Sequence, residues 1–372
     1  MSTQKNTKFI PISEPSITKR EIEYVTKAVK SGWVSSLGEY ITQFEEQFAK
    51  FIGTKYAVSC TNGTVALHLA MVSAGIKPGD EVIIPDLTFV ATASAVKYIG
   101  AIPVFADIDP ATWCIKPDSI KKLITPKTKA IVPVHLYGYP ADMAAINKIA
   151  AEHGLTVFED AAEAHGASIN KKRVGSFGKC GVFSFYGNKI ITTGEGGMIT
   201  TSDQVLHDRA KYLRDHAMSK TKRYWHTELG YNYRITNIQA ALGLAQLHRI
   251  DSIIKKKLKI FSWYKKYLGQ SELFSLNPER KGITNVIWMV SILLSEKLKI
   301  DRDNLMKKLR EKNIDTRPFF YPISQLPMYN TGVINPVAYD IAERGMNLPS
   351  AFNLTEEQVE YICKQMLMLI KD

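Results

Sequence analysis

Cysteine is scarce in this chain, which contains four among 372 residues. The four form no C-x-x-C pair and have no histidine at ligand spacing: Cys60, Cys114, Cys180 and Cys363. The sequence therefore supports neither a disulfide framework nor a metal site. We expect the cysteines to be buried as small hydrophobic residues.

A long uninterrupted hydrophobic run is also missing. The longest apolar region, residues 82–105, is broken by Pro85, Asp86, Lys97 and Pro103, whereas a membrane span needs about 18 consecutive apolar residues. We therefore expect no transmembrane anchor. The first nine residues are polar and lead into no apolar signal region, so that a cytoplasmic location is predicted.

Acidic residues are fewer than basic ones, 36 against 48, which gives a formal net charge of +12. Such a charge would suit a nucleic-acid binder, but the basic residues are dispersed and their densest runs, 171–173 and 255–257, are short. Solvated surface is the better interpretation of these runs, and we expect no nucleic-acid partner. The excess charge favours a substrate that carries phosphate.

Two helices are predicted at the start of the chain. Thr18 and Glu21 form a capping box, and Gly32 can close the helix that follows. A second helix, ended by Gly53, carries three apolar residues on one face: Ile41, Phe44 and Phe48.

Short apolar strands then alternate with helices. The predicted strands are 56–59, 81–84, 102–105, 130–134 and 156–158, and the helices between them are 64–74, 92–98 and 142–153. Parallel neighbours need crossover connections, so this alternation predicts a three-layer α/β/α fold around a mostly parallel sheet. Ligands bind at the carboxyl ends of the strands in such folds.

The last third of the chain has a different pattern. A long helical stretch, 237–268, is followed by a loop near Pro278, a strand-like run over 286–294 and helices near 302–312 and 356–369. This pattern predicts a smaller C-terminal α+β domain. We place the large domain at residues 1–250 and the small one at 251–372.

One lysine, Lys189, lies in a loop between two strand-like runs, within the segments 183–189 and 192–198. Such a setting can bury an amine, and a buried lysine can form a Schiff base with a carbonyl compound. A solvated loop lysine is the alternative. The nearby glycines lack the G-x-G-x-x-G spacing of a dinucleotide site.

Two further segments that follow predicted strands carry candidate cofactor contacts. Asp160 follows the strand that ends at Phe158, and a carboxylate there suits pyridoxal phosphate, whose ring nitrogen must stay protonated. Gly63 and Thr64 open a helix whose N-terminus can bind phosphate, and Ser184 can add a hydroxyl. Taken singly, each segment is better explained by an alternative: an acid that caps the next turn for Asp160, and an N-G-T turn followed by a helix cap for Gly63 and Thr64.

A turn that can bind phosphate, an acid and a lysine, each following a predicted strand, resemble the fold-type I pyridoxal-phosphate enzymes, specifically the sugar-nucleotide aminotransferase family. The resemblance covers nearly the whole chain, and its most specific stretches are 61–64, 159–166, 183–198, 231–237 and 347–350. It implies an aspartate-aminotransferase-like fold and pyridoxal 5'-phosphate as cofactor. L-glutamate and a nucleotide-linked keto-sugar are the implied substrates.

The family's site residues carry over to matching positions. Lys189 becomes the Schiff-base lysine and Asp160 the partner of the ring nitrogen. The other implied cofactor contacts are the phosphate ligands Gly63, Thr64 and Ser184, the stacking ring of Phe89, and Asn232, which reaches the neighbouring subunit's phosphate. This last contact implies a homodimer with shared active sites.

Glu163 departs from the glutamine that many members have beside the cofactor's ring hydroxyl. Glutamate here resembles the perosamine synthase branch, which aminates carbon four of GDP-4-keto-6-deoxymannose for surface polysaccharides such as the O-antigen of lipopolysaccharide. Branch members that act as dehydratases replace the catalytic lysine with histidine, so Lys189 favours transamination. His165 is either a base or a structural residue under the cofactor ring.

Four residues are weaker candidates for the nucleotide and sugar: Arg234, Arg317, Tyr321 and Trp225. Structural salt bridges and core aromatics explain each of them about as well. The sequence also leaves open UDP- or dTDP-linked substrates, and a regulatory protein that binds the cofactor without turnover.

Overall fold

The computed structural model describes residues 8–330 and 332–370. Within these residues, seven strands form one sheet in the order β1-β9-β8-β5-β4-β2-β3. Their bounds are β1 (Tyr56–Cys60), β2 (Glu81–Pro85), β3 (Ile102–Ala106), β4 (Thr128–Ile131), β5 (Thr156–Asp160), β8 (Cys180–Ser184) and β9 (Gly197–Thr201). Only β9 runs against its neighbours, β1 and β8, so the mostly parallel sheet is confirmed.

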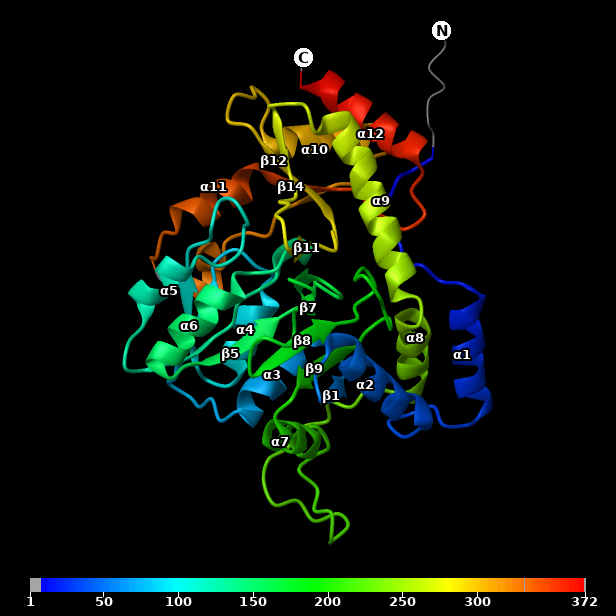
Figure 1. Ribbon diagram of the computed structural model, residues 1–372, viewed down its shortest axis with the longest axis vertical. Helices are drawn as coiled ribbons and strands as arrows, with labels where there is room; N and C mark the ends of the chain where they lie inside the picture. Colours follow the sequence, from blue (N-terminus) through cyan, green and yellow to red (C-terminus); the bar gives the residue numbers. More distant parts are fainter. Residues whose placement is uncertain (1–7, 331, 371–372) are drawn as a thin grey trace.

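Helices cover both faces of this sheet (Figure 1). One face packs against α3 (Gly63–Ser73), α4 (Ala91–Tyr98) and α7 (Gln204–Arg214), and the other against α2 (Glu39–Ile52), α5 (Pro117–Leu123), α6 (Met143–His153) and α8 (Asn237–Leu247). Side chains alternate between the two cores, because successive strand residues point to opposite faces. Val82 and Ile84 enter one core and Ile83 the other. The predicted three-layer arrangement is confirmed.

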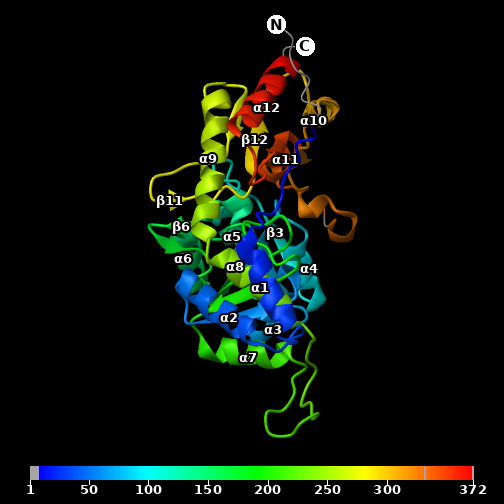
Figure 2. The ribbon, with the colours of Figure 1, turned by 90° about the vertical axis from the view of Figure 1, so that its right-hand side faces the viewer.

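A second unit lies at the upper end of the molecule (Figures 1 and 2). In the described part of the chain its sheet has the order β10-β12-β14-β13 and is antiparallel. Its elements are α9 (Ile250–Leu268), β10 (Phe274–Leu276), β12 (Val290–Leu294), α10 (Arg302–Glu311), β13 (Arg317–Pro318), α11 (Pro336–Arg344), β14 (Gly345–Leu348) and α12 (Glu356–Leu369). A short ribbon of β6 (Ser168–Ile169), β7 (Lys172–Arg173) and β11 (Ile283–Thr284) lies between this unit and the large sheet.

Two predicted elements differ from the structure. The helical stretch 237–268 is two helices, because Arg249 leaves helical geometry and its Nε donates to Glu21 Oε1 at 2.6 Å. The strand predicted over 286–294 begins only at Val290, because Ile287 has a φ of 51° that a strand residue does not adopt.

The predicted domain boundary, between residues 250 and 251, falls just after the first residue of α9 and stays a prediction. One part of the first range packs elsewhere, since Ile10 is buried in the core of the second unit and pairs with Ile314. The chain therefore passes from the core of the second unit at Ile10 to the core of the large sheet at Ala28.

The outermost helix, α1 (Lys19–Lys30), has the predicted capping box between Thr18 and Glu21. It packs on α8 through Glu21 and Ala28, which leaves Ile22 and Val29 exposed. Figure 2 shows α1 on the outside of the molecule, facing the viewer.

The four cysteines are buried, as the sequence predicted. Burial raises the pKa of the Cys60 thiol to about 12. Across residues 8–330 and 332–370, no helix combines the length and the apolar character that crossing a membrane requires. No group of His, Cys, Asp or Glu side chains in those ranges could hold a metal ion.

Candidate active site

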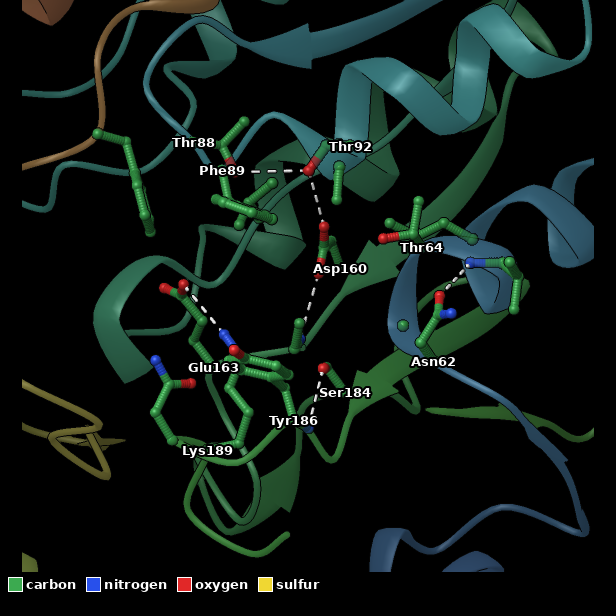
Figure 3. A pocket seen from close by; sticks show the side chains of 18 of the residues that line it. Asn62, Thr64, Thr88, Phe89, Thr92, Asp160, Glu163, Ser184, Tyr186 and Lys189 are labelled. Atoms are coloured by element: carbon green, nitrogen blue, oxygen red, sulfur yellow. Dashed lines mark hydrogen bonds and ion pairs between the residues drawn. The ribbon is translucent and has the colours of Figure 1, made fainter. Parts of the chain in front are cut away.

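A cavity of about 550 Å³ opens at the carboxyl edge of the large sheet. It lies there because β1, β2, β5 and β8 all run toward this edge, and the segments that follow them turn into its walls. Seven residues predicted from the sequence line it: Gly63, Thr64, Phe89, Asp160, Glu163, Ser184 and Lys189. Figure 3 shows Thr64 on one side, Glu163 and Lys189 on the other, and Asp160 between them.

Asp160 is the last residue of β5 and is only 5% exposed. The hydroxyl of Thr92 donates to its Oδ2 at 2.8 Å, and the N–H of Ala162 donates to its Oδ1 at 3.2 Å. Burial raises the pKa of Asp160, and these two hydrogen bonds oppose the rise. A cation beside this carboxylate would favour its ionised form, so the position fits a protonated ring nitrogen of a ligand.

Glu163 and Lys189 face each other across the same cavity. Lys189 Nζ lies 3.5 Å from Glu163 Oε1, and the N–H of Tyr137 donates to Glu163 Oε2 at 2.8 Å. Burial raises the pKa of Glu163, and the nearby lysine partly offsets that effect. The Lys189 side chain is 11% exposed, so its amine is largely removed from water while remaining open to the cavity.

The start of α3 forms the third part of the site. Asn62 caps the helix by accepting the N–H of Val65 at 3.0 Å, and a helix N-terminus leaves further N–H groups without partners inside the helix. A Cβ on Gly63 would lie 2.8 Å from Ser184 Cβ, so only glycine allows β8 to approach this closely. The positive end of the helix and the Ser184 hydroxyl fit a phosphate group.

His165 lies behind the site and does not line the cavity. Its ring packs between Phe183 and Phe185, with centroids 5.4 and 5.5 Å away. Among the described residues neither of its ring nitrogens has a hydrogen-bond partner, and burial lowers its pKa to about 3. The structure therefore places His165 in the aromatic core behind the cavity.

Five other predicted residues lie outside the cavity. Trp225 is 53% exposed on the segment 215–232, which projects beyond α7 in Figure 1. Asn232 ends this segment, and Arg234 donates to Asn232 Oδ1 at 3.0 Å and to Asp215 Oδ1 at 2.7 Å. Arg317 is paired with Asp315 in a separate surface groove. Tyr321 is exposed beside Phe320, which does line the cavity.

Four residues that the sequence did not single out complete or support the site: Thr92, Tyr137, Trp288 and Phe320. Thr92 lies in a helix predicted to start after the second strand, which was a usable signal because that strand end also faces the crevice. Trp288 and Phe320 come from the second unit, and no local pattern indicated that they return to this edge.

A mostly parallel sheet with this cavity at its carboxyl edge is the architecture of pyridoxal-phosphate-dependent aminotransferases. The sugar aminotransferase Spr1654 from Streptococcus pneumoniae, described as putative and solved in its PLP form, superposes with a TM-score of 0.93 at 26% identity, covering 98% of this chain and 99% of that one. The chain belongs to the DegT/DnrJ/EryC1/StrS aminotransferase family, whose sequence profile matches residues 15–367.

Two relatives are similar over nearly their whole lengths. GDP-perosamine synthase from Escherichia coli O157:H7 is 47% identical, with 96% of this chain and 97% of the relative covered. GDP-perosamine synthase from Vibrio cholerae is 43% identical, with 95% and 97% covered. The protein is therefore a pyridoxal-phosphate-dependent sugar aminotransferase.

Proposed function

We propose that this enzyme transfers the amino group of L-glutamate to carbon four of GDP-4-keto-6-deoxymannose and so forms GDP-perosamine. Glutamate leaves as 2-oxoglutarate, and the keto-sugar takes the amine in the second half of the reaction. The similarity to two GDP-perosamine synthases over nearly the full chain supports this choice of substrate. The net charge of +12 also suits a substrate with two phosphates.

Asp160 would hold the ring nitrogen of the cofactor. Bound pyridoxal phosphate supplies an electron sink for cleavage of a carbon–hydrogen bond, provided that its ring nitrogen keeps a proton. The carboxylate is buried, and in the part of the chain that the structure describes no cationic side chain lies within hydrogen-bond distance of it, which makes the charged nitrogen its natural partner. Gly63, Thr64 and Ser184 would hold the phosphate, and Phe89 would cover the ring.

Lys189 would attach the cofactor covalently and, once released, carry the proton between substrate and cofactor carbons. The observation that carries this role is its largely buried amine in the same cavity as Asp160. Glu163, held by the Tyr137 N–H, would meet the ring hydroxyl. One of those two groups must then keep a proton, since like charges at contact distance cannot both persist.

Borohydride trapping tests the covalent attachment directly. Purified protein should absorb visible light and change its absorbance when glutamate is added. Reduction followed by peptide mapping should place the adduct on Lys189. Colourless protein that ignores pyridoxal phosphate would instead indicate a regulatory protein without turnover, and an adduct on another amine would refute the assignment.

A panel of nucleotide keto-sugars tests the substrate. Each is incubated with the enzyme and glutamate, and the products are identified by mass spectrometry and by the position of the new amine. We expect GDP-4-keto-6-deoxymannose to be converted fastest. Faster conversion of a UDP- or dTDP-linked sugar would overturn the proposed substrate while leaving the class of enzyme intact.

A homodimer is the second part of the proposal. Large apolar side chains on α1 and the loop after it remain exposed in the single chain: Ile22 (61%), Val29 (52%), Trp33 (58%) and Leu37 (64%). Exposed groups of this kind mark interaction surfaces. Asn232, Arg234 and Trp225 also lie outside their own chain's cavity, so that a contact with substrate or cofactor would be made in the partner's cavity.

Charge on the α1 face should disrupt this dimer. The double variant Ile22→Asp, Val29→Asp is compared with Val205→Asp, which changes an exposed valine on α7. Light scattering should report monomers for the first and dimers for the second. Mixing Lys189→Ala with Asn232→Asp should restore part of the activity if sites are shared, and no restoration would contradict the role of Asn232.

The cellular role is part of the same proposal. GDP-perosamine would serve surface polysaccharide synthesis, such as the O-antigen of lipopolysaccharide, with the enzyme in the cytoplasm. Cell fractionation and sugar analysis of polysaccharide from a deletion strain test both points. Loss of perosamine from the polysaccharide is the expected result.

A further inference from the structure

Trp288 touches the loop that carries Lys189 in two places. The centre of its ring lies 3.9 Å from Lys189 Nζ, and its Nε1–H donates to the main-chain carbonyl of Asn188 at 2.7 Å. The residue is buried and lines the cavity. One side chain, on the segment that leads into β12, therefore contacts both the amine and the peptide group beside it.

Two backbone segments with unusual φ values, one at Tyr137 and one at Ile287, meet beside Trp288 and fix its position. Tyr137 and Ile287 have φ values of 52° and 51°, in the left-handed region that β-branched and bulky residues rarely adopt. The N–H of Trp288 donates to the carbonyl of Tyr137 at 3.2 Å, and the two rings stack with centroids 6.2 Å apart. Backbone strain persists where surrounding structure imposes it, and it gathers at functional sites.

Lys257 on α9 holds the same segment from the other side. Its buried Nζ donates to the main-chain carbonyls of Trp288 at 3.1 Å and Ser350 at 2.5 Å. Both the N–H and the carbonyl of Trp288 are therefore bonded. The indole has little freedom to leave the Lys189 loop.

Trp288 and Glu163 hold the Lys189 amine by different physical means. Glu163 Oε1, 3.5 Å away, attracts the ammonium as a negative charge. The ring face attracts it through the negative potential above an aromatic ring, without offering an atom that can take its proton. The ring can therefore keep the amine in place while the carboxylate is engaged elsewhere.

We propose that Trp288 is a positioning residue for Lys189. Its ring packs against the Lys189 side chain and directs the free amine into the cavity, and its N–H fixes the loop that carries the amine. This inference rests on the proposed role of Lys189 as covalent anchor and proton carrier. It adds a residue of the second unit to the machinery of the large sheet.

The test follows the attachment of pyridoxal phosphate to cofactor-free protein by borohydride trapping at timed intervals. Trp288→Leu removes ring and N–H, and attachment to Lys189 should be about tenfold slower, whereas Trp288→Phe keeps a ring face and should be only about threefold slower. Trp263→Leu is the matched control, because the Trp263 ring packs on Lys256 at 4.8 Å outside the cavity. This control should attach the cofactor at the wild-type rate.

Glutamate deuterated at its α-carbon supplies a second readout. Loss of Trp288 should raise the isotope effect on turnover, because a poorly held amine makes proton transfer the slowest step. A packing defect that only reduces the folded fraction leaves this ratio unchanged. The proposal would be overturned if Trp288→Leu attached the cofactor at the wild-type rate. It would also be overturned if Trp288→Leu and Trp288→Phe lost the same fraction of that rate and the isotope effect stayed unchanged. An adduct away from Lys189 in the wild type would instead defeat the proposed function itself.

Discussion

Ionisable side chains have opposite surroundings in the cavity and on the projecting segment 215–232. In the cavity, Asp160 and Glu163 are buried, and burial raises the pKa of each. On the segment, Glu228 and Trp225 are exposed, and Glu228 is paired with Arg209 at the surface. Exposed ion pairs cost and contribute little, whereas buried charges are expensive unless a partner is supplied. The contrast indicates that the cavity is built for a charged ligand.

The largest effect should come from removing the amine at the centre of the cavity. Lys189→Ala should lower turnover by about a thousandfold or more, the upper range of a positioned acid or base. Steady-state kinetics with saturating cofactor measure it. Lys179→Ala removes an exposed lysine paired with Asp203 and should keep normal turnover. Comparable rates in the two variants would mean that the buried amine has no special role.

The second largest loss of activity is expected for Asp160→Asn. The change keeps the shape and removes the charge, and the loss of a charge-assisted hydrogen bond of about 1.5–3 kcal/mol predicts a fall in kcat of about a hundredfold. Asp203→Asn is the control, because Asp203 caps α7 at the surface and asparagine caps equally well. Full activity of Asp160→Asn would refute the pairing with the ring nitrogen.

The arginines outside the cavity should have smaller effects, on substrate binding alone. Arg234→Ala should raise the Michaelis constant for the nucleotide sugar about tenfold, as expected for a lost guanidinium–phosphate contact. Arg317→Ala should raise it less, because Arg317 lies in a surface groove separate from the cavity. If neither variant changes the Michaelis constant for the nucleotide sugar, neither residue contacts the substrate.

The smallest effect concerns stability without cofactor. The pKa of Glu163 is raised by burial above its usual 4.5, so the folded protein holds that proton more tightly than the unfolded chain. Stability is then lost as pH rises above that usual value. Glu163→Gln removes this loss, and its melting temperature should exceed the wild type's by about 2 °C at pH 7.

A matched control and a pH series sharpen this comparison. The stability gap should narrow as the pH falls below 4.5, where the wild-type carboxyl keeps its proton in both states. Glu152→Gln changes an exposed glutamate of α6 and should show no gap at either pH. A wild type that is more stable than Glu163→Gln at pH 7 would reverse the argument.

Local sequence patterns predicted well which residues line the cavity next to the ends of the strands. Lys189, Asp160 and Gly63 lie at the ends of strands that could be recognised from short apolar runs, and the parallel sheet brings such ends together. Tyr137 was missed, since a backbone N–H carries no signature of the acid it bonds, whereas Thr92 could have been found from its place after the second strand. The roles of the predicted site residues stay predictions.

The sequence by itself determined the layered fold and the chemical groups at the strand ends, because hydrophobic period and strand-end position are local properties, and its motifs carried the resemblance to the family. Only the tertiary structure decided that Trp288 and Phe320 reach the cavity and that Trp225 and Arg317 do not. Those placements depend on how the second unit and the projecting segment pack against the rest. Packing over long sequence separations leaves no periodic trace in the chain.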